Sequence, residues 1–220
     1  DVAVDGIACV EGKATETTGK FQAVQWGSVT FAALLAILGG GLIAKHSNYH
    51  IGYLLLIPFL LSMFYILYKF KEPLVQKNKD SFVNNLLSYK ELFLNKDFVL
   101  VCIFLYLYKT APAFGTPLLY IKRDIFHWSA MQIAYLDAIV LALELIGAWF
   151  YAKYCKVIPI KKTLIFSILI GVPITLCYLY YTPITAYLYG ALFGTIGMII
   201  HLVCMDFMAR KSLAGKEATS

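Results

Sequence analysis

The fold is decided by one uncharged stretch of 43 residues between Thr163 and Met205, which reads TLIFSILIGVPITLCYLYYTPITAYLYGALFGTIGMIIHLVCM. A helix needs about 20 apolar residues to cross the hydrocarbon core of a bilayer, so this stretch has the length of two crossings. Thr182-Pro183 lies near its middle, and the residue before a proline disfavours helix. We therefore predict two transmembrane helices, over 163–181 and 184–205, joined by a tight turn.

The rest of the chain repeats this pattern. Hydrophobic residues make up 60% of the 220 residues and charged residues 15%, against roughly 45–50% and 25% in soluble proteins. Disordered, coiled-coil and free soluble proteins are excluded by this composition. Five further apolar intervals follow the same pattern: 2–10, which adjoins the chain start, and 21–44, 49–68, 98–121 and 125–152, which have helical length. Charged residues lie inside three of them: Asp5 in 2–10, Lys109 in 98–121, and Asp137 and Glu144 in 125–152. The predicted fold is an all-α, polytopic transmembrane helical bundle.

The basic residues lie between the apolar runs and predict the orientation of the spans. Alternate loops form two sets, of which one (11–20, 69–97, 153–162 and 206–220) holds 15 Lys and Arg and the other (45–48, 122–124 and 182–183) holds 3. Cytoplasmic loops carry the excess of Lys and Arg, so the first set is predicted to be cytoplasmic. The net charge of +6 therefore reports orientation in a bilayer, and no nucleic-acid partner is expected.

One long loop divides the spans into two groups. We predict the end of an N-terminal bundle over 1–72, a cytoplasmic central loop with an interfacial helix over 73–97, and an incomplete C-terminal bundle over 98–220. Within the loop, apolar residues from Phe82 to Phe93 recur at helical spacing after Asp80-Ser81, which suits a helix lying on the membrane surface or a solvated linker helix. Because the chain begins at Asp1 inside an apolar run, we expect it to be an internal fragment.

Charged residues inside spans are the candidate functional groups, since each costs at least about 2.5–3.5 kcal/mol at mid-membrane and such residues usually face a cavity or a partner. Asp1 and Asp5 are four residues apart and share a helix face, which suits a proton relay or a structural ion pair. Asp137 and Glu144 are seven apart, also on nearly one face. We assign Asp137 to substrate or proton binding, with its predicted depth greater than that of Glu144.

Two lysines complete this set. Lys109 lies in the middle of its interval, with Pro112, Gly115 and Pro117 in the next two turns, so we expect a broken helix there of the kind that builds transporter sites. Lys109 would hold an anionic substrate group or pair with Asp5 or Asp137. For Glu144 we expect a gating contact with Lys153 or with a neighbouring helix. The five cysteines have no CxxC spacing and indicate packed free thiols, and neither a metal site nor a cofactor is expected.

Two motifs near the start of the chain resemble the folate-biopterin transporter family, a branch of the major facilitator superfamily. Asp1-Val2-Ala3-Val4-Asp5-Gly6 is similar to that family's paired-aspartate motif, and the stretch from Gly19 through Gln22 to Trp26-Gly27-Ser28 is similar to its next helix. Matching stretches follow in order: 111–120, 129–136, 145–151 and 159–162. The resemblance implies that the spans are helices four to ten of twelve. Tyr151 stands where the wider superfamily has a gating aspartate after Gly147.

What the resemblance implies is a monomeric, proton-coupled transporter of a pteridine, folate or biopterin, and not an enzyme. Asp1, Asp5, Gln22, Trp26, Lys109 and Asp137 are then the residues of substrate binding or proton coupling, with Glu144 and Lys153 in gating. The partners are a small-molecule substrate, a proton and the lipid bilayer. Two alternatives stay open: a polytopic membrane enzyme such as an intramembrane protease, and a non-transporting membrane scaffold or receptor.

Overall fold

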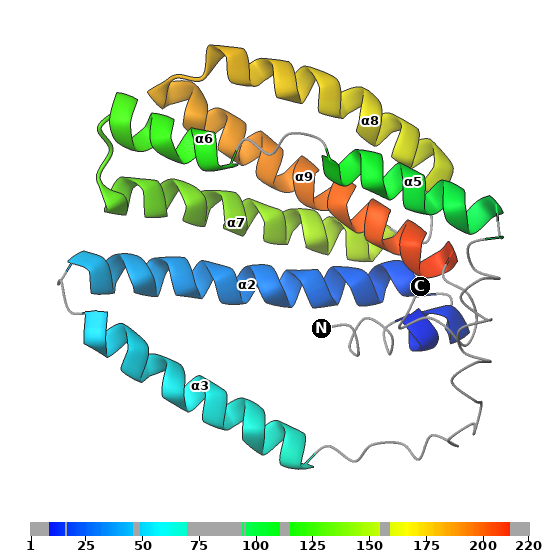
Figure 1. Cartoon of the computed structure of the whole chain (residues 1–220), viewed down its shortest axis with the longest axis horizontal. Coiled ribbons are helices and arrows are strands. Elements are labelled where there is room, and N and C mark those ends of the chain that lie inside the picture. Colours follow the sequence, from blue (N-terminus) through cyan, green and yellow to red (C-terminus); the bar gives the residue numbers. More distant parts are fainter. Residues whose placement is uncertain are drawn as a thin grey trace.

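The computed structural model describes residues 9–15, 17–45, 49–69, 94, 96–110, 115–154 and 159–211. Throughout these ranges the chain is built from helices (Figure 1). The elements in chain order are α2 (Thr18–Lys45), α3 (Tyr49–Lys69), α5 (Lys96–Thr110), α6 (Gly115–Tyr120), the π-helix η1 (Ile121–Ile125), α7 (Ala130–Tyr154), α8 (Ile160–Cys177), the 3₁₀ turn η2 (Tyr178–Tyr180) and α9 (Pro183–Lys211). Asp1, Asp5 and the predicted interfacial helix lie outside the described residues.

Four helices of the described chain are long and apolar enough to cross a membrane, over Thr18–Ile43, Ala130–Tyr154, Lys161–Tyr180 and Pro183–Arg210. In α3 the apolar part is shorter, over His50–Ile66. Many large apolar side chains of these helices are exposed, for example Phe166 at 62% and Leu169 at 65%. Exposure of this extent suits a surface whose solvent is lipid.

The predicted turn at Thr182-Pro183 is confirmed, because α8 and η2 end before it and α9 begins at Pro183. Pro183 occupies the first helical position, where its missing N–H costs nothing. Thr182 and Thr185 cap the N-terminus of α9 reciprocally. The Thr182 N–H donates to Thr185 Oγ1 at 2.7 Å, and the Thr185 N–H donates to Thr182 Oγ1 at 3.2 Å.

The described part of α5 ends at Thr110 and that of α6 begins at Gly115. Residues 111–114, where the break after Lys109 was predicted, lie outside the described residues, so the break stays a prediction. The prediction of a loop over 122–124 was wrong. Residues 121–125 form the π-helix η1, which continues α6. The chain then turns at His127, whose φ is 53°, and α7 begins at Ala130 instead of Ile125.

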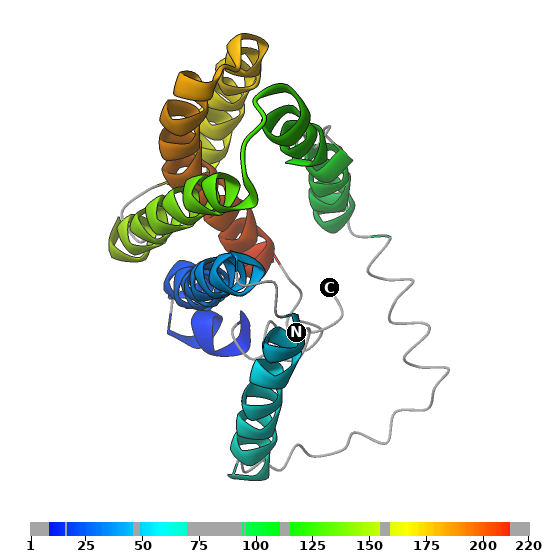
Figure 2. The ribbon, with the colours of Figure 1, turned by 90° about the vertical axis from the view of Figure 1, so that its left-hand side faces the viewer.

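The core of the bundle is formed by α2, α7 and α9, which lie side by side (Figures 1 and 2). Glycines allow α7 and α9 to approach closely: a Cβ added to Gly147 would lie 2.5 Å from the carbonyl oxygen of Thr195, and one added to Gly194 would lie 2.7 Å from that of Val140. Figure 2 shows α3 projecting away from this core.

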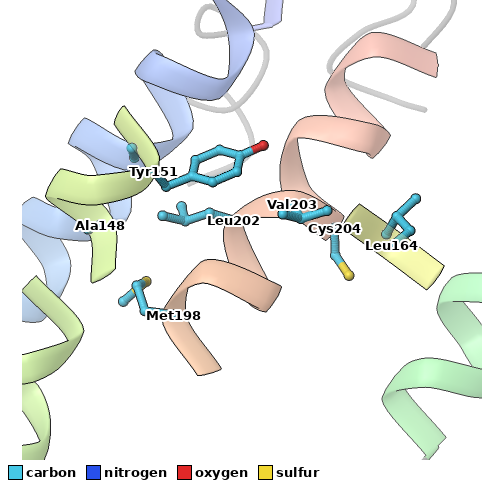
Figure 3. Close-up of a cluster of buried hydrophobic side chains, with 8 residues drawn as sticks. Ala148, Tyr151, Leu164, Met198, Leu202, Val203 and Cys204 are labelled. Atoms are coloured by element: carbon cyan, nitrogen blue, oxygen red, sulfur yellow. The ribbon is translucent and has the colours of Figure 1, made fainter. Parts of the chain in front are cut away.

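One buried apolar cluster joins the three helices near a shared end, with Leu164 of α8 at its edge (Figure 3). Its members are Ala23, Ala148, Tyr151, Leu164, Met198, Leu202, Val203 and Cys204. Leu202 and Val203 have no exposed surface. The first turns of α2 and the last turns of α7 and α9 meet there, and three loops of the set rich in Lys and Arg (11–20, 153–162 and 206–220) adjoin that end.

Candidate functional site

The N-terminus of α7 sets the depth of the two acidic residues that it carries. Ser129 and Gln132 form a capping box, in which the Ser129 N–H donates to Gln132 Oε1 at 2.8 Å and the Gln132 N–H donates to Ser129 Oγ at 3.3 Å. With the helix starting at Ala130, Asp137 is its eighth residue and Glu144 its fifteenth of 25. Glu144 therefore lies nearer the middle of α7 than Asp137 does, and the greater membrane depth of Asp137 stays a prediction.

Asp137 is paired across the bundle with Lys122. The Lys122 Nζ atom lies 3.0 Å from Asp137 Oδ1, and the side chains are 12% and 40% exposed respectively. Lys122 belongs to η1, and turns with π-helical geometry are frequent at functional sites. Lys122, which was predicted to lie in a loop, therefore forms the ion pair with Asp137 that was one of the options for Lys109. The side chain of Lys109 itself lies outside the described residues.

Aromatic side chains from the α8–α9 connection form a wall beside these charges. The ring of Tyr178 has its centroid 5.2 Å from that of Phe193 and 5.9 Å from that of Tyr181. Tyr189 stacks on Phe193, with centroids 5.5 Å apart. Because η2 directs the end of α8 against the start of α9, the half-buried rings of Tyr178 and Tyr181 pack on each other and on neighbouring aromatic rings.

The hydroxyl of Tyr181 stays protonated over the whole physiological range. Burial, with smaller contributions from Tyr178 and Asp137, raises its pKa to about 12. The Tyr181 ring also stacks on Phe126, with centroids 5.8 Å apart. Tyr181 is therefore a fixed polar group that can donate or accept a hydrogen bond but does not carry charge.

Together these groups enclose a cavity of about 300 Å³ between α6, α7 and α9. The cavity is lined by Leu118, Lys122, Leu136, Asp137, Val140, Glu144, Tyr178, Tyr181, Ala186, Tyr189, Gly190, Phe193 and Gly194. Its chemistry is that of a small-molecule site, with an apolar and aromatic lining and a few convergent polar groups. Among the described residues, no group of three or more His, Cys, Asp or Glu side chains gathers to hold a metal ion.

Two predicted site residues on α2 lie elsewhere. Gln22 is 5% exposed, at the interface between α2 and the rest of the core. The Trp26 ring meets His201 of α9 edge-on, with ring centroids 4.3 Å apart. Neither residue is among those that line the cavity.

The structure does not bring Glu144 and Lys153 together. Nine residues separate them on α7, which is two and a half helical turns and places them on opposite faces. The Lys153 Nζ atom lies 5.2 Å from the centroid of the Trp149 ring and 5.4 Å from that of Tyr154. The contact of Glu144 with a neighbouring helix stays a prediction.

A family model described as the Major Facilitator Superfamily matches residues 14–216, which is most of the chain. The chain belongs to the major facilitator superfamily. It is a multi-pass integral membrane protein and a membrane transporter of that superfamily, whose members move small molecules across a lipid bilayer. A comparison with curated proteins gave no match, and one with solved structures gave none.

Three lining residues of this cavity were not identified from the sequence. Lys122 lies beside Arg123 and Asp124, so a loop was the simplest interpretation of the three charges. Tyr189 and Phe193 are four residues apart on α9 and therefore share a face, which was the available signal for an aromatic wall.

Proposed function

We propose that this transporter carries a pteridine, either biopterin or folate, through the cavity between α7 and α9, together with protons. One observation carries the proposal: two carboxylates, Asp137 and Glu144, line a cavity whose opposite wall is aromatic. Planar heteroaromatic rings with polar edges are complementary to such a site, because the faces can stack while the edges form hydrogen bonds.

Glu144 is the residue that we assign to the polar edge of the ring. A pteridine presents an aminopyrimidine edge with two adjacent N–H donors, and a carboxylate can accept both as charge-assisted hydrogen bonds. Glu144 lies nearer the middle of α7 than Asp137. Within the described part of the chain it makes no ion pair, whereas Asp137 pairs with Lys122. Tyr178 and Phe193 are placed for the face of the ring to stack on.

The size of the cavity favours the smaller pteridine. A volume of about 300 Å³ is at the low end of the roughly 300–1,000 Å³ typical of ligand pockets. It suits the bicyclic ring and short side chain of biopterin, whereas the benzoyl-glutamate tail of folate would extend beyond it. Lys109 remains our predicted partner for that anionic tail, and Asp1 and Asp5 remain predicted coupling residues.

For the coupled proton we propose the second carboxylate of the cavity, Asp137, because a Glu144 carboxylate that accepts hydrogen bonds from the ring cannot carry the proton while the substrate is bound. Intramembrane Asp and Glu residues in transporters mark ion and proton pathways. A substrate bound at Glu144 that favours the protonated form of Asp137 couples its own movement to that of a proton, because binding shifts the protonation equilibrium and protonation shifts binding.

The test is direct binding of biopterin to the purified full-length protein. Glu144→Gln keeps the shape of the side chain but removes its charge, and a hydrogen bond to a charged group contributes about 1.5–3 kcal/mol. We therefore expect biopterin affinity to fall by roughly 10-fold to 100-fold. Asp124→Asn is the matched control, because Asp124 is an exposed acid that pairs with Arg123 and does not line the cavity.

The control should bind biopterin as the parent protein does. Unchanged affinity in Glu144→Gln, or equal losses in Glu144→Gln and Asp124→Asn, would remove Glu144 from the site.

A further inference from the structure

A buried carboxylate at the far end of the same helices carries a second inference. Asp206 of α9 has no exposed surface and accepts hydrogen bonds from Thr18, Tyr151 and Arg210, which belong to three different helices. Thr18 Oγ1 donates to Oδ1, and Tyr151 Oη donates to Oδ2 at 2.9 Å. Arg210 binds both oxygens, with Nε 3.0 Å from Oδ1 and Nη2 2.8 Å from Oδ2.

These bonds connect helices from opposite sides of the central segment of the chain. Thr18 is the first residue of α2, which precedes that segment, whereas Tyr151 and Asp206 belong to α7 and α9, which follow it. Major facilitator transporters consist of two halves that rock against each other around the substrate site. The Thr18–Asp206 hydrogen bond therefore joins the two halves, while the Tyr151–Asp206 bond lies within one.

The α7–α9 interface and the interface of α2 with these two helices also differ in composition. The difference is the one expected if α2 separates from α7 and α9 while those two helices stay together. The α7–α9 interface is closed by Gly147 and Gly194, whose backbones meet the partner helix without an intervening side chain. By contrast, α2 presents Thr18, Gln22 and Thr30 to the core on one face, each 5% exposed or less. Polar side chains at an interface can be rehydrated when it opens, so α2 is the helix that can separate.

The place of the network fits a gate. It lies at the ends of α2, α7 and α9 that adjoin the loops rich in Lys and Arg, which the charge distribution marks as cytoplasmic (Figure 1). The cavity lies toward the opposite end, beside the starts of α7 and α9. Figure 3 shows Tyr151 extending from α7 over the buried cluster toward α9, above Leu202.

We propose that Asp206 is the positioning residue of a cytoplasmic gate, and that its hydrogen bond to Thr18 must break in every transport cycle. Asp206 holds α2 against α7 and α9 in the closed state, and Tyr151 and Arg210 keep its carboxylate in place for that bond. This inference depends on membership of the superfamily and on the two-half movement, and not on which substrate is carried.

The experiment measures how fast a buried reporter near the gate reacts with a reagent on the cytoplasmic side. The reporter is Ala23→Cys in the full-length protein with its native cysteines replaced, since Ala23 is 3% exposed and belongs to the buried cluster beneath the network. A membrane-impermeant maleimide is applied to inside-out vesicles. Thr18→Val in this background removes the hydroxyl and keeps the side-chain volume.

We expect Thr18→Val to raise the labelling rate of the reporter by about tenfold, the effect of losing one hydrogen bond to a charged acceptor. Thr18→Ser, which keeps the hydroxyl, should label at the parent rate. Thr195→Val is the matched control, because Thr195 donates to the Leu143 carbonyl at 3.1 Å between α9 and α7, within one half. It should leave the labelling rate unchanged.

Equal labelling in the parent and in Thr18→Val would overturn the proposal, as would an equal rise in Thr195→Val, which would indicate general loosening. If Thr18→Val does not accumulate in the membrane, Asp206→Asn tests the same bond, since an amide oxygen is a weaker acceptor than a carboxylate. Labelling that rises in Asp206→Asn supports the gate, and labelling at the parent rate overturns it.

Discussion

At the scale of single residues, the Lys122–Asp137 ion pair is the feature of the cavity with the clearest energetic consequence. Lys122 is largely buried and Asp137 is partly exposed, so removing either partner leaves a charge in a poorly solvated place. We expect Lys122→Met and Asp137→Asn each to lower the melting temperature of the detergent-solubilised protein. The double variant should lose less stability than the sum of the two single losses, by about 1 kcal/mol.

This expectation is checked by a double-mutant cycle on melting temperatures, with Asp124→Asn as a control for loss of an exposed acid. Asp124 pairs with Arg123, and both side chains are more than half exposed. Additive losses in the cycle would mean that the 3.0 Å contact between Lys122 and Asp137 contributes no coupling energy.

The sequence identified Asp137 and Glu144 as candidate site residues, but it did not identify Lys122 as the partner of Asp137. A charge inside an apolar run is visible in the sequence because its cost in hydrocarbon is large. Lys122 is hidden because its neighbours are charged too, and it enters the cavity only through the π-helical geometry of η1. The tyrosines at 178 and 181 are ambiguous by type, since the same residues favour membrane interfaces and binding sites.

At the scale of the helices, the glycines of α7 and α9 determine how closely the pair can pack. A methyl group at position 147 would meet the Thr195 carbonyl oxygen, a backbone atom that cannot move aside. We expect Gly147→Ala to destabilise the protein by about 1–3 kcal/mol, the usual cost of overpacking a core. The measurement is the melting temperature of the purified protein.

Gly40→Ala provides the comparison, because no atom of the described structure lies within 4 Å of the Cβ that it would add. It should be neutral or stabilise the protein by up to about 1 kcal/mol through helix propensity. Equal destabilisation by both changes would show that close α7–α9 packing is not the reason for glycine at position 147.

Helix ends were only partly predictable from the sequence. Pro183 marks the start of α9 because proline has a strong local rule, and the helix begins at that residue. The start of α7 depends on the reciprocal bonds of Ser129 and Gln132, which apolar length alone does not reveal. The five-residue difference, from Ile125 to Ala130, places Asp137 nearer the start of α7 and Glu144 nearer its middle.

At the scale of the whole molecule, the distribution of 15 against 3 basic residues between alternate loops predicts which ends face the cytoplasm. We expect Lys79→Cys to be protected from an impermeant maleimide added outside intact cells, and Arg123→Cys to be labelled, with native cysteines replaced in both. Arg123 suits this test because 64% of its side chain is exposed.

The reverse labelling pattern would invert the topology and move the Asp206 network to the outer face. The division into bundles at 1–72 and 98–220 stays a prediction, although α2 packs on α7 and α9 across that boundary. The sequence could not supply this packing, because it depends on contacts between residues as far apart as Thr18 and Asp206.

The central claim is that a pteridine bound at Glu144 moves through the cavity together with a proton. Uptake of radiolabelled biopterin by the full-length protein in proteoliposomes, with and without an imposed pH gradient, tests it most directly. We predict that the gradient drives accumulation of biopterin above its equilibrium level, and that Glu144→Gln abolishes this accumulation while Asp124→Asn preserves it. Biopterin uptake that is the same with and without the pH gradient would contradict the account. So would a Glu144→Gln protein that accumulates biopterin as the parent does.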